Sequence, residues 1–140
     1  MSDKAFFDTN ILVYAFGAKS IDDPRIDAAE QLLEPGGVVS VQVLNEFVQV
    51  CRSKAKLPWN QVVGSLEVIR DLCGPAIPLT MATHDAAVDL CRSHGFNIYD
   101  SLILAAAAQA GCTTVYSEDM QHGQKIGNLT IVNPFLAVKD

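Results

Sequence analysis

Short apolar runs alternate along the chain with segments of helical length, and Gly or Pro residues stand between them. The runs are rich in β-branched and aromatic residues, as buried strands are, while several of the longer segments carry apolar stripes at helical spacing. Parallel strands need a crossover connection, and a helix usually supplies it. We therefore predict an α/β fold in which helices cover both faces of a small central parallel sheet.

The boundaries of these elements follow from their capping and breaking residues. Strands are expected over Lys4–Asp8, Val38–Ser40, Ile77–Leu79, Thr113–Ser117 and Leu129–Val132. Helices are expected over Asn10–Phe16, over Pro24–Glu34 behind Asp22 or Asp23, from the cap Ser40 to Lys54, and over Trp59–Cys73. Thr83 is expected to cap a helix that ends at Gly95, and Asn97 starts one that ends at Gly111. The polar stretch from Glu118 to Asn128 is expected to be a loop.

Composition excludes several classes of protein. A chain of 140 residues that is 49% hydrophobic and 19% charged is too apolar to be disordered, and it has the length of a single domain, residues 1–140. The longest apolar stretch, Leu102–Ala108, is too short to cross a membrane, and no signal peptide is expected, so the cytoplasm is the expected compartment. The net charge of −6 argues against nonspecific coating of nucleic acid.

Acidic residues stand where an open α/β sheet binds its ligands, beyond the carboxyl ends of the strands. Asp8 closes the first predicted strand, and Asp119 follows the fourth, two residues after Ser117. Asp100 lies in the first turn of the helix that begins near Asn97. Each of these acids alone is equally explained as a helix cap or a loop residue.

Glu46 is harder to explain as a structural residue. It borders the apolar stripe of its predicted helix, with Val43 three residues before it and Val50 four residues after it. A carboxylate in such a place must shift its pKa, find a donor or bind a cation. Four converging acids would repel one another without a cation, and oxygen ligands suit Mg²⁺ or Mn²⁺. The sequence therefore favours a divalent metal site.

Four motifs in a fixed order carry a family resemblance. The chain reads FFDTN near its start, LNEF in the middle, YDSLILAAA later and YSEDMQHG after the next predicted strand. This ordered set resembles the PIN-domain ribonucleases, especially the VapC-like toxins of toxin–antitoxin pairs, over almost the whole chain. The resemblance implies a PIN-like α/β/α sandwich with a small central parallel sheet.

The resemblance also implies an activity and a set of residues. Asp8, Glu46, Asp100 and Asp119 would form an acidic pocket for Mg²⁺ or Mn²⁺, supported by Asn10 and Ser117. The adjacent Glu118 and Asp119 are both candidates for the fourth acid, of which Asp119 is preferred. Water would be the nucleophile in an endonucleolytic cleavage of RNA that leaves a 3′-hydroxyl and a 5′-phosphate. The implied partners are an RNA substrate, a small antitoxin protein and a second copy of the chain, with no membrane.

Two alternative functions remain open. A phosphatase of the haloacid-dehalogenase type also begins with an Asp at the end of its first strand, but it needs a second Asp where this chain has Asn10. A PIN-like binding module without catalysis would be expected to lack one of the acids, whereas all four are present. Dinucleotide binding is disfavoured because no G-x-G-x-x-G follows the first strand.

Overall fold

The sheet of the protein has four strands, in the order β1 (Ala5–Phe7), β2 (Thr114–Tyr116), β4 (Leu129–Val132) and β3 (Lys125–Ile126). The structure is a computed structural model, and it describes residues 4–17 and 22–138. The strand pairs β1–β2 and β2–β4 are parallel, whereas β3 runs antiparallel to β4 at the edge. The predicted α/β class and its small, mainly parallel central sheet are therefore confirmed.

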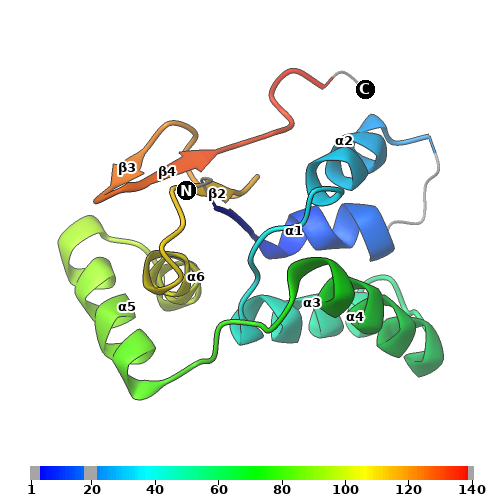
Figure 1. Ribbon diagram of the computed structural model, residues 1–140, viewed down its shortest axis with the longest axis horizontal. Coiled ribbons are helices and arrows are strands. Elements are labelled where there is room, and N and C mark those ends of the chain that lie inside the picture. The colour runs from blue at the N-terminus through cyan, green and yellow to red at the C-terminus, as the bar shows by residue number, and fades with distance from the viewer. Residues whose placement is uncertain (1–3, 18–21, 139–140) are drawn as a thin grey trace.

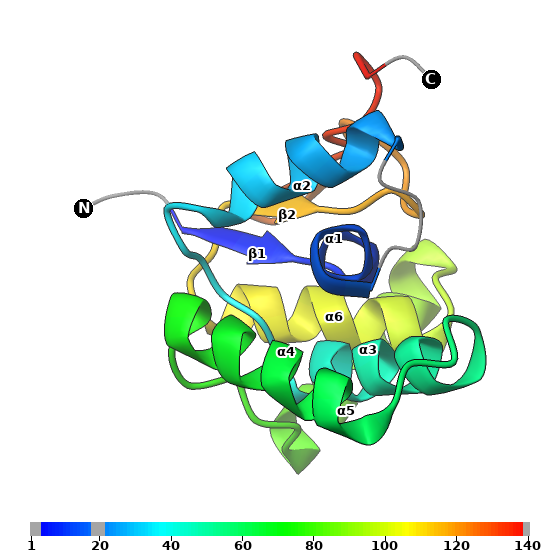
Figure 2. The same ribbon diagram turned by 90° about the vertical axis from the view of Figure 1, so that its right-hand side faces the viewer.

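Helices lie on both sides of this sheet. In Figure 2, α2 (Pro24–Leu33) lies on one side of β1 and β2, and the other long helices lie on the opposite side. These are α3 (Val41–Ser53), α4 (Trp59–Cys73), α5 (Met81–His94) and α6 (Ile98–Gln109). The strand β1 leads directly into α1 (Thr9–Leu12), which continues as the π-helical turn η1 (Val13–Gly17) (Figure 1).

The helix α6 is the most buried of these elements. Every residue from 101 to 107 is buried, including Ile103, Leu104 and three alanines in a row. Alanine side chains let a helix approach its neighbours closely, so α6 fits between α5 and the sheet (Figure 1). The apolar run at 102–108 is thus a core helix, and no helix among the described residues is both long and apolar enough for a membrane span.

Four local predictions were wrong. The segments Val38–Ser40 and Ile77–Leu79 are not strands, because each meets its neighbour through single bridges, Phe6 with Val38 and Ser40 with Ile77. Gly36, at φ 84°, turns the chain just before Val38–Ser40, and Ser40 at the end of that segment is already the cap of α3. Too few extended residues therefore remain there to form a ladder.

The expected loop at 118–128 contains the two-residue strand β3, which pairs with β4 through a tight turn. The α5 cap is Thr80 and not Thr83. Thr83 is the third residue of that helix, and its hydroxyl completes a capping box with Thr80. The spacing of two threonines alone left the cap ambiguous, because either hydroxyl suits that role.

Candidate active site

Asp8 lies at the centre of the candidate site. Asp8 is only 4% exposed and directly follows β1. Its backbone amide donates to the Tyr116 carbonyl at 3.0 Å, which continues the pairing of β1 with β2 by one residue. The carboxylate accepts hydrogen bonds from the Thr9 amide at 2.6 Å and from the Ser117 hydroxyl at 2.7 Å. Asp8 therefore caps α1, as the structural interpretation predicts, but it is buried far more deeply than a surface cap.

Ser117 connects two of the predicted acids. The residue is buried at the end of β2, and its hydroxyl donates to Asp8 Oδ2. The same oxygen accepts from the amides of Asp119 at 3.2 Å and Met120 at 3.3 Å. Ser117 thus fixes both the carboxylate after β1 and the backbone that follows β2.

Glu46 comes from the second turn of α3 and is half-buried. Its Oε1 accepts from the Thr9 hydroxyl at 2.9 Å, and its Oε2 accepts from Gln42 Nε2 at 2.7 Å. Gln42 precedes Glu46 by four residues, so both side chains lie on the same face of α3. The carboxylate that borders the apolar stripe has therefore found donors, and one of them is the neighbour of Asp8.

Asp100 lies in the first turn of α6 and is half-buried. Asn97 caps that helix, because its Oδ1 accepts from the Asp100 amide at 2.8 Å. The Asn97 side-chain amide also donates to Asp100 Oδ2 at 3.0 Å. Asn97 therefore orients the Asp100 carboxylate as well as starting the helix.

Glu118 and Asp119 face different neighbours. Asp119 Oδ2 accepts from Asn10 Nδ2 at 2.8 Å, which links it to the first turn after β1. Glu118 accepts from the Tyr14 hydroxyl at 2.7 Å and lies 3.5 Å from Arg25 Nη1. The structure thus brings Asp119, and not Glu118, to Asn10 beside Asp8.

The pKa values show that these carboxylates share one electrostatic environment. Burial, and then the charges of Glu46 and Asp119, raise the pKa of Asp8 from 3.8 to about 6, against the opposing effect of its hydrogen bonds. Burial also raises the pKa of Asp100, with a further contribution from the charge of Glu46. The pKa of Asp119 is raised by burial and then by the charges of Glu118 and Asp100. All four predicted acids therefore lie near one another.

The donor set suits a hard divalent cation, because it consists of carboxylate oxygens whose ionised forms disfavour one another. In the arrangement seen for residues 4–17 and 22–138, no three His, Cys, Asp or Glu side chains converge closely enough to hold one ion. Glu46 and Asp119 direct their oxygens to donors on Thr9, Gln42 and Asn10 instead. Each carboxylate oxygen has a further lone pair, so a cation could bind while these donors keep the side chains in place. The set therefore fits a metal in its chemistry, and the carboxylates would have to move closer together around the ion.

Sequence reasoning missed several residues around these acids. Thr9 and Gln42 hold Glu46, while Tyr14 and Arg25 hold Glu118. Gln42 could have been found from its spacing of four residues before Glu46 on a predicted helix. The contacts of Glu118 are made with residues that lie far away in the sequence. Arg25 precedes Glu118 by 93 positions and Tyr14 precedes it by 104, and no local pattern reveals such pairs.

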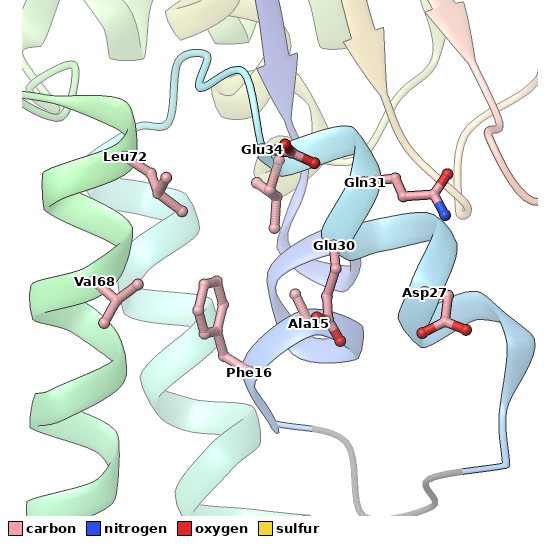
Figure 3. A pocket seen from close by; sticks show the side chains of 9 residues that line it. Ala15, Phe16, Asp27, Glu30, Gln31, Glu34, Val68 and Leu72 are labelled. Carbon is pink, nitrogen blue, oxygen red and sulfur yellow. The ribbon is translucent and has the colours of Figure 1, made fainter.

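A second feature is a groove of about 460 Å³ between η1, α2 and α4, which none of the four predicted acids lines (Figure 3). Phe16, Val68 and Leu72 give it an apolar wall, and the acids of α2 line the opposite side (Figure 3). These acids are Asp27, Glu30 and Glu34. Phe16 was expected to be a core or dimer-face residue, and here it is half-buried at the edge of a groove.

Solved structures of similar fold come from toxin–antitoxin systems. A toxin–antitoxin complex from Klebsiella pneumoniae is 22% identical with a TM-score of 0.69, and the alignment covers 94% of this chain and 98% of that one. VapC20 of Mycobacterium tuberculosis, described as a sarcin-ricin loop cleaving toxin, is 19% identical with a TM-score of 0.65 over 83% and 90% of the chains. VapBC2 of Rickettsia felis, bound to a promoter DNA fragment, is 22% identical with a TM-score of 0.62 over 91% and 96%.

These likenesses establish the fold, and no curated protein matches the chain in sequence. The family model of the PIN domain matches residues 5–125, which include all four acids as well as Asn10 and Ser117. That span runs from β1 into β3 and is most of the chain. The motifs, the order of the elements and the family model agree, and the chain belongs to the PIN-domain family.

Proposed function

We propose that the protein is a metal-dependent endoribonuclease, and the toxin of a type II toxin–antitoxin pair. The observation that carries the proposal is the grouping of Glu46, Asp100 and Asp119 with the buried Asp8, whose pKa is raised to about 6 by burial and then by the charges of Glu46 and Asp119. PIN-domain nucleases generally use divalent metal ions. The positive charge of such an ion would reduce the repulsion among the four carboxylates.

Asp8, Glu46, Asp100 and Asp119 are the residues that we propose to hold Mg²⁺ or Mn²⁺. The ion, when bound, supplies an activated water and neutralises charge that develops on the phosphodiester. Ser117 keeps Asp8 in place through its hydroxyl, and Asn10 and Asn97 do the same for Asp119 and Asp100. Each carboxylate therefore has its own supporting donor, as ligands that must be held in position require.

The proposed partners are an RNA substrate, a second copy of the chain and a small antitoxin. The solved relatives include two toxin–antitoxin assemblies, which supports an antitoxin here. The acidic pocket and the acid-lined groove suit a protein with basic side chains, whose C-terminal segment would cover the pocket with a basic residue in place of the metal.

Light scattering tests the proposed homodimer, for which it should give twice the mass of the monomer. The cytoplasm, where RNA is available, is the proposed compartment.

The proposal is tested by cleavage of a labelled structured RNA and a labelled single strand with purified, partner-free protein. We expect cutting in Mg²⁺ or Mn²⁺ and none in EDTA. Asp100→Asn should reduce the rate by about 100-fold or more, because even outer-shell changes around a metal typically cost 10–100-fold. Asp71→Asn, at an exposed position of α4, is the matched control and should cleave normally.

Two results would contradict the proposal. Cleavage that persists in EDTA would reject the metal, and cleavage that survives Asp100→Asn would reject the pocket. A folded wild-type protein that cuts neither RNA but still binds Mn²⁺ would point to an intact site with a narrow RNA target. One that also binds no Mn²⁺ would point to a PIN-like binding module without catalysis.

A further inference from the structure

Glu118 and Asp119 are adjacent acids after β2 that are held in different ways. The Glu118 carboxylate is half-buried and bound on both oxygens, by the Tyr14 hydroxyl at 2.7 Å and by Arg25 Nη1 at 3.5 Å. The Asp119 residue is exposed, and its Oδ2 accepts from Asn10 at 2.8 Å. One carboxylate therefore faces η1 and α2, and the next faces the acidic site.

The groups around Glu118 are themselves fixed. Asp23, the cap of α2, accepts from Arg25 Nη2 at 2.9 Å and from its Nε at 3.0 Å. The guanidinium carbon of Arg25 lies 4.8 Å from the centre of the Tyr14 ring, and that ring meets Phe135 edge-on at 5.0 Å. Burial and the contact with Glu118 raise the pKa of Tyr14, so its hydroxyl keeps the proton that it donates. We call Tyr14, Arg25 and Glu118 the Glu118 clamp.

The backbone amide of Asp119 is held as well. The Ser117 hydroxyl accepts from the Asp119 and Met120 amides while it donates to Asp8. Asp119 thus directly follows Glu118, which is tied to η1 and α2, while its own amide is held by Ser117, which is tied to Asp8. The Asp119 residue is exposed, and its carboxylate accepts from Asn10 and lies within the electrostatic influence of Lys54.

We propose that Tyr14 and Arg25 are positioning residues, which hold Glu118 so that the next carboxylate, Asp119, is presented to the acidic site. This inference rests on the proposed function and extends it to residues outside the metal-binding set. It also assigns the two adjacent acids different roles, since Glu118 is an anchor and Asp119 a ligand. Glu118 would have to give up both Tyr14 and Arg25 to reach an ion.

The first test measures Mn²⁺ affinity and RNA cleavage in Tyr14→Phe. This variant removes one hydroxyl and keeps the ring that packs on Arg25 and Phe135. We expect the Kd for Mn²⁺ to weaken and kcat to fall by about tenfold each, while KM for RNA changes by less than about twofold. Tyr116→Phe, which removes the hydroxyl of a half-buried tyrosine stacked on Phe7, is the matched control and should match wild type.

Substitutions of Glu118 separate an anchor from a ligand. Glu118→Gln keeps an oxygen that accepts from Tyr14 at 2.7 Å and gives up only the longer 3.5 Å contact with Arg25, so it should retain Mn²⁺ affinity to within about threefold of wild type. Glu118→Ala removes that acceptor and should lose about tenfold, as Tyr14→Phe does. A Gln variant as defective as the Ala variant would overturn the inference and make Glu118 a ligand itself.

Amide hydrogen exchange in EDTA tests the clamp without metal or substrate. Tyr14→Phe should speed exchange of the Asp119 and Met120 amides by about tenfold, and Tyr116→Phe should not. Unchanged exchange and unchanged Mn²⁺ affinity in Tyr14→Phe would overturn the inference, even if the protein cleaves RNA. Faster exchange in a protein that neither binds Mn²⁺ nor cleaves RNA would support the clamp and reject the proposed function.

Discussion

The single residue Asp8 lowers the free energy of unfolding of the metal-free protein at neutral pH. Its carboxylate is buried and lies near the charges of Glu46 and Asp119, and the two donors that bind it do not offset these effects. The pKa of about 6 lies roughly two units above 3.8, which corresponds to a cost of about 3 kcal/mol at neutral pH. A residue that destabilises the fold in this way is typical of a functional site.

Asp8→Asn should therefore remove a pH-dependent destabilisation of the metal-free protein. The unfolded chain releases the Asp8 proton near pH 4 and the folded chain near pH 6, so the folded state binds more protons in between. The free energy of unfolding of the wild type then falls as the pH rises through this window. The variant lacks this loss, so the free energy of unfolding of the variant minus that of the wild type should grow by about 2 kcal/mol from pH 4.5 to pH 8.

Urea unfolding in EDTA at several pH values measures this difference. The lost hydrogen bonds of Asp8→Asn add an offset that depends little on pH, so the slope isolates the charge. Asp71→Asn, at an exposed position, provides the control and should show no such slope. A constant difference between Asp8→Asn and wild type across the range would show that burial does not perturb Asp8.

At the scale of elements, close packing at the edge of the sheet fixes where β1 ends and the site begins. The Val38 amide donates to the Ala5 carbonyl at 2.9 Å, and the Val38 carbonyl accepts from the Phe7 amide at 3.0 Å. Gly37 precedes this bridge and packs directly on the Phe7 ring, so there is no room for a side chain. Phe7 is the residue before Asp8, and its place in the core sets the position of that carboxylate.

Gly37→Ala should consequently disturb both stability and the site. A Cβ at this position would lie 2.8 Å from Phe7 Cζ and 2.9 Å from the Ala5 carbonyl oxygen. Such overpacking should lower the free energy of unfolding by about 2–3 kcal/mol and reduce RNA cleavage, because β1 must shift. Gly64→Ala in α4, where a Cβ meets nothing within 4 Å, should instead gain about 0.5–1 kcal/mol. Urea unfolding compares the two, and equal stabilities would refute the packing argument.

At the scale of the whole molecule, local patterns predicted much of what is seen. Periodicity and caps placed the long helices and the central strands, and the rule that ligands bind beyond the strand ends drew attention to Asp8 and Asp119. The edge strand β3 and the single bridges at Val38 and Ile77 were not predicted, because they depend on pairing between distant segments. The same holds for the Glu118 clamp, whose members come from three separate parts of the chain.

We propose that four carboxylates, two of them just beyond β1 and β2 and two on α3 and α6, hold a divalent ion. Crystals grown with Mn²⁺ test it most directly, because anomalous scattering locates the metal independently of activity. We predict an anomalous peak bounded by Asp8, Glu46, Asp100 and Asp119, with Glu118 still on Tyr14, and no peak in Asp8→Asn. A peak elsewhere, or none at Mn²⁺ concentrations that support RNA cleavage, would contradict the account.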